Sequence, residues 1–163
     1  MVNVFVVGSY VVDLMSRTPH MPKPGETVLG GPFKMGPGGK GNNQAVAAAR
    51  LGARVTMVTR VGRDVFGDEA VAHFQRENIS TKFVTRDDKE PTGAALIAVD
   101  DSSENMIVVA LGACGGVTRT DVYDAEQKLI QSDVVLVQLE TSIDAVQAAV
   151  ELANKHGKPV ILN

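Results

Sequence analysis

A glycine-rich run around one lysine is the segment of this sequence best suited to bind a ligand. It reads Gly36-Pro37-Gly38-Gly39-Lys40-Gly41-Asn42-Asn43-Gln44-Ala45. Glycine lets a backbone approach a ligand closely, and the N–H groups at the start of a following helix can point at it. Lys40 adds three donors, and Asn43 and Gln44 add amides, so the segment would suit the hydroxyls of a small polar ligand. A tight turn that only caps a helix explains the same residues equally well.

Two nucleotide-binding motifs match this run formally, and both fit poorly. The glycines of Gly36–Gly41 match the dinucleotide pattern G-x-G-x-x-G, but Gly30–Pro32 interrupts the segment where a clean preceding strand is required. The next strand ends in Thr59–Arg60 and not in an acidic residue. The P-loop pattern fails because Lys34 falls at its first glycine and Gly41 at its Mg²⁺-binding Ser or Thr. A dinucleotide-binding oxidoreductase fragment therefore stays only as an alternative.

Two acidic residues stand where buried strands are expected to end. Asp13 follows the apolar run Val4–Val7, and Glu140 follows Val134–Leu139. A carboxylate at such a place can accept two hydrogen bonds from ligand hydroxyls. A surface or helix-capping role is the alternative for each. For Glu140 the two roles are compatible, because a helix is expected to begin near Ser142.

Strands and helices alternate along most of the chain. The hydrophobic patterns predict strands at 4–7, 55–59, 134–139 and 160–162, and helices at 43–51, 65–77, 121–131 and 142–156. This alternation predicts an α/β domain with a largely parallel sheet. Segments 93–99 and 105–111 form a predicted hairpin, and 27–29 and 32–35 are short extended pieces. These four segments predict a separate small β element.

Composition narrows the class of protein. With 163 residues, 44% of them hydrophobic and 21% charged, the chain has the make-up of one globular domain. A net charge of −3 and scattered basic residues argue against nucleic-acid binding, and no apolar stretch is long enough to cross a membrane. One cysteine and no signal peptide predict a cytoplasmic protein without a disulfide. The three histidines lack metal-ligand spacing, so no metal site is predicted.

The glycine-rich run resembles the first signature of ribokinase-like (PfkB-type) carbohydrate kinases, Gly-Gly-Lys-Gly-x-Asn-Gln-Ala, which lies at the sugar site of that family. Further segments that resemble family landmarks follow in the same order along nearly the whole chain: Gly8–Asp13, Pro24–Thr27, Gly62–Gly67, Thr92–Ala95 and Gln138–Glu140. The chain is identified on this basis as a member of the family, nearest to its ribokinase branch. One residue departs from the pattern, because ribokinases often carry a sugar-binding Asn where this sequence has Val11.

The resemblance implies a Rossmann-like three-layer sandwich with a small β lid, formed by segments near 12–36 and 92–111. It implies that residues 1–163 are the N-terminal sugar-binding half of one kinase domain, truncated after that half. The implied reaction is ATP-dependent phosphorylation of a pentose, with ribose at O5 favoured. Matched to the family's motifs one by one, the implied substrate-binding residues are Asp13, Gly39, Lys40, Asn43, Ala95, Ile97 and Glu140.

The resemblance places the catalytic half outside the chain. The family's Gly-Ala-Gly-Asp motif, which carries the base and the anion hole, does not occur in these residues. The sites for ATP, Mg²⁺ and a monovalent cation are likewise implied in the C-terminal half. We therefore assign no catalytic residue and expect this chain alone to lack kinase activity. A non-catalytic sugar-binding module is a second alternative.

The hairpin predicts a dimer. Both alternating faces of 93–99 and 105–111 are apolar, whereas a half-solvated hairpin alternates apolar with polar residues. One face can close over the sugar through Ala95 and Ile97. The other face needs cover, and the resemblance implies a homodimer in which two lids pack about a two-fold axis. Burial of the hairpin within its own chain is the alternative.

Overall fold

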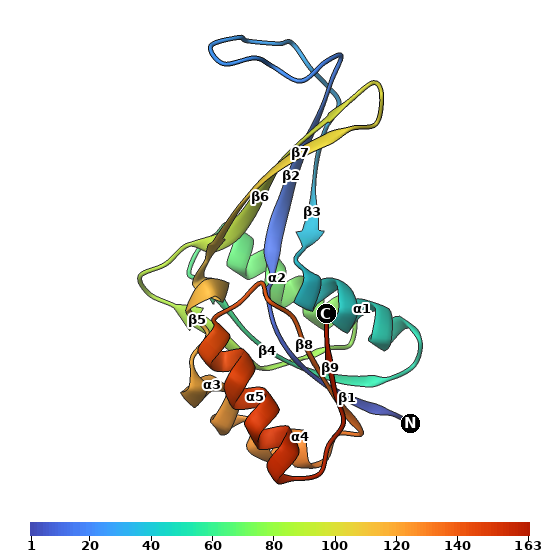
Figure 1. The fold of residues 1–163 in the computed structure, drawn as a ribbon, viewed down its shortest axis with the longest axis vertical. Helices are drawn as coiled ribbons and strands as arrows, with labels where there is room; N and C mark the ends of the chain where they lie inside the picture. The colour runs from blue at the N-terminus through green and yellow to red at the C-terminus, as the bar shows by residue number, and fades with distance from the viewer.

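The main body of the protein is a three-layer α/β sandwich from which a second sheet projects (Figure 1). The computed structural model describes all residues from 1 to 163. The main sheet has five parallel strands in the order β5-β4-β1-β8-β9. Their bounds are β1 Asn3–Val7, β4 Arg54–Gly62, β5 Ser80–Asp87, β8 Val134–Val137 and β9 Val160–Leu162.

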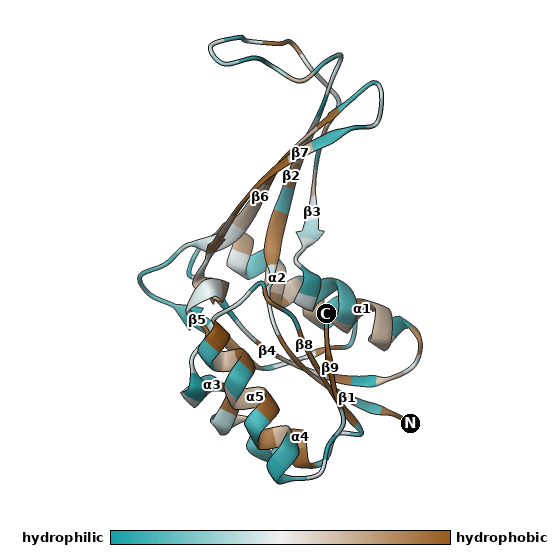
Figure 2. Ribbon diagram, in the orientation of Figure 1, coloured by the Kyte–Doolittle hydropathy of each residue, from teal (hydrophilic) through white to brown (hydrophobic).

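Helices cover both faces of the main sheet, which explains why its strands read as continuous apolar runs. Val4 and Val6 of β1 pack toward helices α1 and α2, whereas Phe5 and Val7 pack toward α3 to α5. The helix bounds are α1 Lys40–Arg50, α2 Val65–Arg76, α3 Arg119–Asp124, α4 Glu126–Ile130 and α5 Ile143–Lys155. In Figure 2 the central strands are coloured as hydrophobic and the helices alternate between hydrophobic and hydrophilic. The predicted three-layer α/β class is confirmed.

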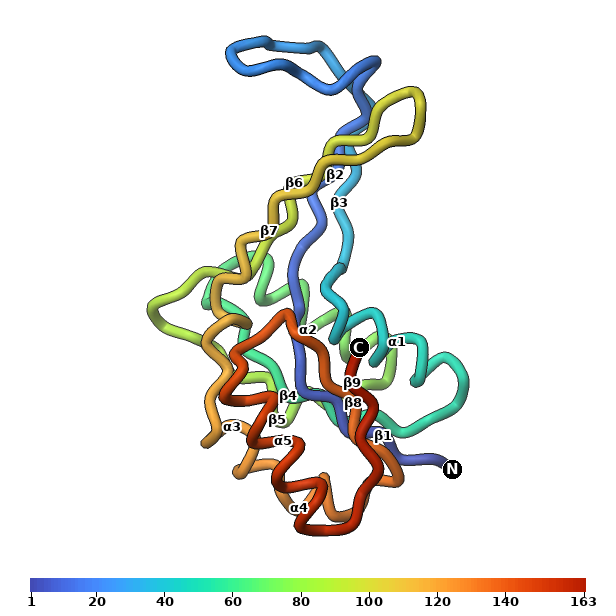
Figure 3. Tube along the Cα trace, in the orientation of Figure 1, coloured from blue at the N-terminus to red at the C-terminus, as the bar shows by residue number.

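The second sheet, called here the projecting sheet, has four strands in the order β3-β2-β6-β7. Their bounds are β2 Val11–Thr18, β3 Phe33–Gly38, β6 Thr92–Asp100 and β7 Asn105–Gly112. Strand β2 pairs in parallel with β6, and the other two pairs are antiparallel. The tube view shows these strands leaving the body together (Figure 3). Only Gly8–Tyr10 separates β1 from β2, so one continuous stretch of chain links the two sheets.

Asp64 fastens the projecting sheet to the body. Its side chain caps α2 by accepting a hydrogen bond from the Gly67 amide at 2.8 Å. The same carboxylate accepts hydrogen bonds from the Thr92 amide at 2.8 Å and the Thr92 hydroxyl at 2.7 Å. Thr92 is the first residue of β6, so Asp64 fixes where that strand leaves the body.

Several predicted elements differ from the structure. No strand forms at 27–29, and the strand predicted at 32–35 runs over Phe33–Gly38. The helix predicted to start at Asn43 begins at Lys40, because Gly39, with φ of 91°, turns the chain directly out of β3. The helix predicted at 121–131 is divided at Ala125. Strand β5 was missed because this half-exposed edge strand mixes charged and apolar residues.

The outer face of the projecting sheet exposes large apolar side chains. Successive residues of a strand point to opposite faces, so the members of this surface follow from the register of the four strands. Their exposed fractions are 64% for Phe33, 57% for Met35, 56% for Leu96, 61% for Met106 and 68% for Val108. Residues 1–163 therefore leave this face uncovered. None of the helices is long and apolar enough to span a membrane.

Candidate functional site

A cavity of about 220 Å³ lies where the projecting sheet meets the body. It is smaller than the roughly 300–1,000 Å³ of pockets for drug-sized ligands, so it suits a small molecule. The structure brings all seven residues proposed from the sequence to this one cavity. The lining residues are Val11, Asp13, Gly39, Lys40, Asn43, Ala95, Ile97, Ile107, Val109 and Glu140.

Ile107 and Val109 line the cavity although they are not among the seven residues proposed from the sequence. Both lie on β7, where Ile107 pairs with Ile97 and Val109 pairs with Ala95. The signal that could have identified them was the hairpin register, since residues opposite each other share a face.

Asp13 offers an uncommitted carboxylate to the cavity. It was predicted at the end of a buried strand, but it is the third residue of β2 in the projecting sheet. Burial, followed by the nearby Glu140 charge, raises the pKa of Asp13, and no group of the chain donates a hydrogen bond to it. The carboxylate lies over Gly38, where a Cβ atom would fall 2.1 Å from Oδ1. Gly38 therefore leaves the space that Asp13 occupies.

Glu140 binds several groups around the cavity through hydrogen bonds and an ion pair. It lies in the turn after β8, which ends at Val137 and not at Leu139 as predicted. Its Oε2 accepts hydrogen bonds from the Ser9 hydroxyl at 2.9 Å and the Lys40 amide at 2.8 Å, and Oε1 pairs with the Lys40 ammonium. Partial burial opposes ionisation, but the hydrogen bonds from Lys40 and Ser9 outweigh it and hold the pKa of Glu140 below its usual range.

The amides at the start of α1 are occupied by the chain itself, which corrects the expectation that they point at a ligand. Besides the Lys40 amide, the Gly41 amide donates to the Ser9 hydroxyl at 3.3 Å, and the Asn42 amide donates to the Ser9 carbonyl at 2.9 Å. A Cβ atom at Gly41 would fall 2.6 Å from the Ser9 nitrogen. The glycine here permits close packing of backbone on backbone. The phosphates of ATP or of a dinucleotide therefore do not fit this helix start.

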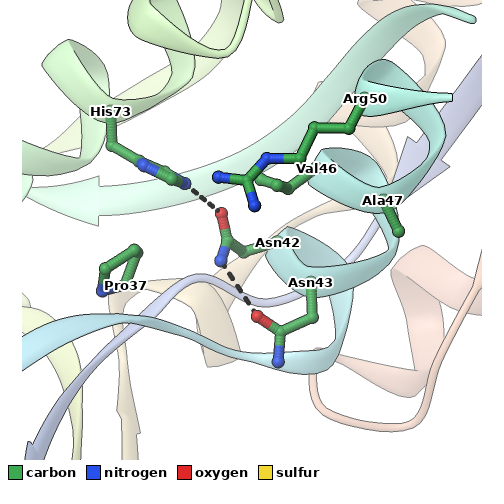
Figure 4. Close-up of a pocket in the computed structure, with 7 residues that line it drawn as sticks. All are labelled: Pro37, Asn42, Asn43, Val46, Ala47, Arg50 and His73. Atoms are coloured by element: carbon green, nitrogen blue, oxygen red, sulfur yellow. Dashed lines mark hydrogen bonds between the residues drawn. The ribbon is translucent and has the colours of Figure 1, made fainter. Parts of the chain in front are cut away.

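Asn43, which lines the cavity near Asp13, stands at the end of a short hydrogen-bond relay that Figure 4 draws. The ring Nε2 of His73 lies 3.0 Å from Oδ1 of Asn42, and the side-chain NH₂ group of Asn42 donates to Oδ1 of Asn43 at 3.2 Å. Burial lowers the pKa of His73, which favours the neutral ring. Because the Asn43 oxygen is engaged, its NH₂ group is the part left to donate to a ligand. No local pattern indicates this relay, since His73 lies 31 positions from Asn42.

The larger cavity that Figure 4 shows offers less chemistry than its size suggests. It encloses about 440 Å³ between α1 and α2. The His73 and Asn42 side chains on its wall bond each other, and Arg50 is paired with Glu77. These three side chains are thus bonded within the chain.

Two further features bear on the chemistry of the site. Cys114 is fully buried, and burial raises the pKa of its thiol to about 12, so it is not a nucleophile at neutral pH. No group of three or more His, Cys, Asp or Glu side chains could hold a metal ion.

The cavity near Asp13 therefore combines an open acceptor, a lysine–glutamate pair and an amide donor against an apolar wall. These groups suit a small molecule that carries several hydroxyls. The sequence matches the profile of the pfkB family carbohydrate kinases over residues 1–163. The chain belongs to this family.

Comparisons with individual proteins agree with this family assignment. The chain is 42% identical to a ribokinase of Haemophilus influenzae, covering 97% of this chain and 52% of that protein. It is 39% identical to a deoxyribokinase of Salmonella typhi, covering 99% of this chain and 53% of that protein. A solved structure of Arabidopsis thaliana ribokinase, complexed with ribose and ATP, matches with a TM-score of 0.87 and 28% identity, over 99% of this chain and 53% of that one. The chain spans about half the length of the relatives that it matches.

Proposed function

We propose that this protein is an ATP-dependent kinase that phosphorylates the primary hydroxyl of a pentose, and that residues 1–163 supply its sugar site. Ribose, phosphorylated at O5, is the substrate favoured by the sequence. The observation that carries the proposal is the open Asp13 carboxylate beside the Lys40–Glu140 pair in a small cavity. Relatives named ribokinase and deoxyribokinase at 42% and 39% identity support it.

The residues of this chain would bind and orient the sugar. Asp13 accepts hydrogen bonds from one or two hydroxyls, and Asn43 donates to another hydroxyl. Glu140 holds the Lys40 ammonium at the cavity. The ammonium stays paired with Glu140 there. Phosphoryl transfer depends mostly on positioning and on stabilisation of charge, so a site that fixes the acceptor hydroxyl supplies a real part of catalysis.

The projecting sheet would act as a lid over the sugar. Ala95 and Ile97 of β6 and Ile107 and Val109 of β7 form its inner surface at the cavity. A closed apolar surface excludes water, which would otherwise compete as acceptor of the phosphoryl group. We further propose that the outer surface, with Leu96 and Val108, packs against a second copy in a homodimer. Both residues are more than half exposed in the single chain.

ATP, Mg²⁺ and a monovalent cation are proposed to bind outside residues 1–163. The amides at the start of α1, which could have held phosphates, are bound to Ser9 and Glu140. The relatives are about twice as long as this chain. The sequence-based expectation that these residues alone lack kinase activity stays a prediction.

The test is ADP formation by the full-length protein with ribose, in the presence of Mg²⁺ and ATP. We expect ADP release that depends on ribose, and loss of most of it in the Asp13→Asn variant at low sugar concentration. Ribose binding without ADP formation would favour the non-catalytic sugar-binding module. Tight binding of a nicotinamide dinucleotide, with no response to ribose, would favour the oxidoreductase alternative.

A further inference from the structure

His73 of α2 and Asn42 of α1 form a buried polar pair next to the sugar cavity. His73 is 6% exposed and Asn42 is 1% exposed, so their hydrogen bonds depend on groups of the chain. The His73 ring packs against two other aromatic rings, with its centroid 6.3 Å from that of Tyr10 and 5.7 Å from that of Phe74. This packing holds the ring nitrogen Nε2 in place, 3.0 Å from Oδ1 of Asn42.

Asn43 depends on this pair for its orientation. Its side chain is exposed, and the side-chain NH₂ group of Asn42 is the one group of the chain that hydrogen-bonds it. A side-chain amide has two orientations that exchange its oxygen and its nitrogen. Figure 4 shows the Asn43 oxygen turned toward Asn42 and the nitrogen on the far side. A rotation of Asn43 alone would break the hydrogen bond that joins the two residues.

The hydrogen bonds of the relay can run in two directions, and the position of the proton on His73 selects between them. Burial lowers the pKa of His73, so at neutral pH the ring is uncharged and carries one N–H. With the proton on Nε2, His73 donates to Asn42, Asn42 donates to Asn43, and the Asn43 NH₂ group is left for a ligand. With the proton on Nδ1, Nε2 becomes an acceptor, both amides turn over, and Asn43 presents its oxygen.

The chemistry of the cavity favours the first direction. Its titratable groups are the carboxylates of Asp13 and Glu140 and the ammonium of Lys40, so its net charge is negative. Such a charge attracts the positive NH₂ end of an amide and repels its oxygen. A sugar hydroxyl that gives its one hydrogen to Asp13 also needs a donor for its own oxygen. The Asn43 NH₂ group is such a donor, whereas the Asn43 oxygen would face a second acceptor.

We propose that His73 is a positioning residue for the sugar, which acts through Asn42 to hold the Asn43 NH₂ group toward the cavity. This role rests on the proposed function and adds to the sugar site a residue that does not line the cavity. Without the His73 N–H the amides are free to turn over, and one hydrogen bond to the sugar is lost. Loss of one neutral hydrogen bond should weaken sugar binding by about threefold to tenfold.

The test is a double-mutant cycle between His73→Leu and Asn43→Ala, with ribose affinity of the full-length protein measured by titration calorimetry. His73→Leu should weaken ribose binding by about threefold to tenfold, and it should have no further effect when Asn43→Ala is present. His73→Gln should keep most of the wild-type affinity, because a glutamine amide can donate from nearly the same place. His156→Leu is the matched control. His156 pairs with Glu126 at 2.9 Å and lies away from the cavity, so ribose affinity should not change.

Heteronuclear NMR of the wild-type protein is a second measurement that needs neither sugar nor the folding of a variant. The chemical shifts of the ring nitrogens distinguish the two neutral forms of histidine. At neutral pH the His73 ring should carry its proton on Nε2. A proton on Nδ1 would reverse the relay and overturn the inference.

The possible failures of the binding test are distinct. Unchanged affinity in His73→Leu overturns the inference, and so does an equal loss with and without Asn43→Ala, because His73 would then act by another route. Both results leave the proposed pentose kinase intact. Wild-type affinity in Asn43→Ala also overturns the inference, since Asn43 would not bind the sugar. Absence of ribose binding by the wild-type protein refutes the proposed ribose site itself.

Discussion

Replacement of Asp13 by Asn should lower sugar affinity without lowering the stability of the fold. The substitution keeps the volume but exchanges an acceptor oxygen for a donor amide in the cavity. A mismatched polar contact of this kind costs about 1–3 kcal/mol, which is roughly one to two orders of magnitude in sugar affinity. The assay is sugar binding to the full-length protein by titration calorimetry.

The same variant should not lose stability. The Asp13 carboxylate has no hydrogen-bond donor in the chain, and burial and the Glu140 charge raise its pKa, so its ionisation opposes folding. Because the group is partly exposed and screened, removing the charge should add only about 0–1 kcal/mol, or up to about 4 °C in Tm. The raised pKa fixes the sign: the difference is absent below about pH 3.8 and develops as the pH rises through the folded-state pKa.

Asp121→Asn is the matched control, because this aspartate is fully used within the chain. Its carboxylate accepts hydrogen bonds from Arg60 at 2.8 Å and from Thr118 at 2.7 Å, and it lies away from the cavity. This variant should lower Tm by several degrees and leave sugar affinity unchanged. If Asp13→Asn instead behaves like Asp121→Asn, then Asp13 is structural and the proposed site is misplaced.

Three further predictions concern the lid, the glycine run and the lysine–glutamate pair. Val108→Lys should yield monomers by light scattering. Ile107 faces the cavity, so Ile107→Lys should instead weaken sugar binding. A wild-type protein that is monomeric at micromolar concentration would refute the dimer. Gly41→Ala should lower Tm by several degrees, since its methyl carbon would lie 2.6 Å from the Ser9 nitrogen, and an unchanged Tm would contradict this packing. The lowered pKa of Glu140 means that its stabilising contribution is present above about pH 4.5 and is lost as the pH falls through the lower folded-state value. Wild type should therefore lose more stability than Glu140→Gln as the pH falls below 4.5 in chemical denaturation, and equal losses would argue against the pairing with Lys40.

Much of the fold could be predicted from local sequence. The continuous apolar run of β1 requires cover on both faces, and its alternate residues indeed pack against different helices. The order of motifs was sufficient to identify the family and to nominate the seven residues that the structure brings to one cavity. Local pattern was weakest at β5, an edge strand whose residues are only half buried.

The chemical state of each site residue was decided by contacts distant in sequence. Residue type marked both Asp13 and Glu140 as hydroxyl acceptors, but only the fold pairs Glu140 with Lys40, 100 positions away, and leaves Asp13 without a partner. The glycines of 36–41 permit either an open helix start or close packing of backbone on backbone. Close packing is what forms, because Ser9 accepts hydrogen bonds from the amides at the start of α1. The resemblance marked Val11 as a departure from the family pattern, and strand register places it on the same face as Asp13. A residue's type fixes which hydrogen bonds it can make, whereas tertiary structure decides which of them remain available to a ligand.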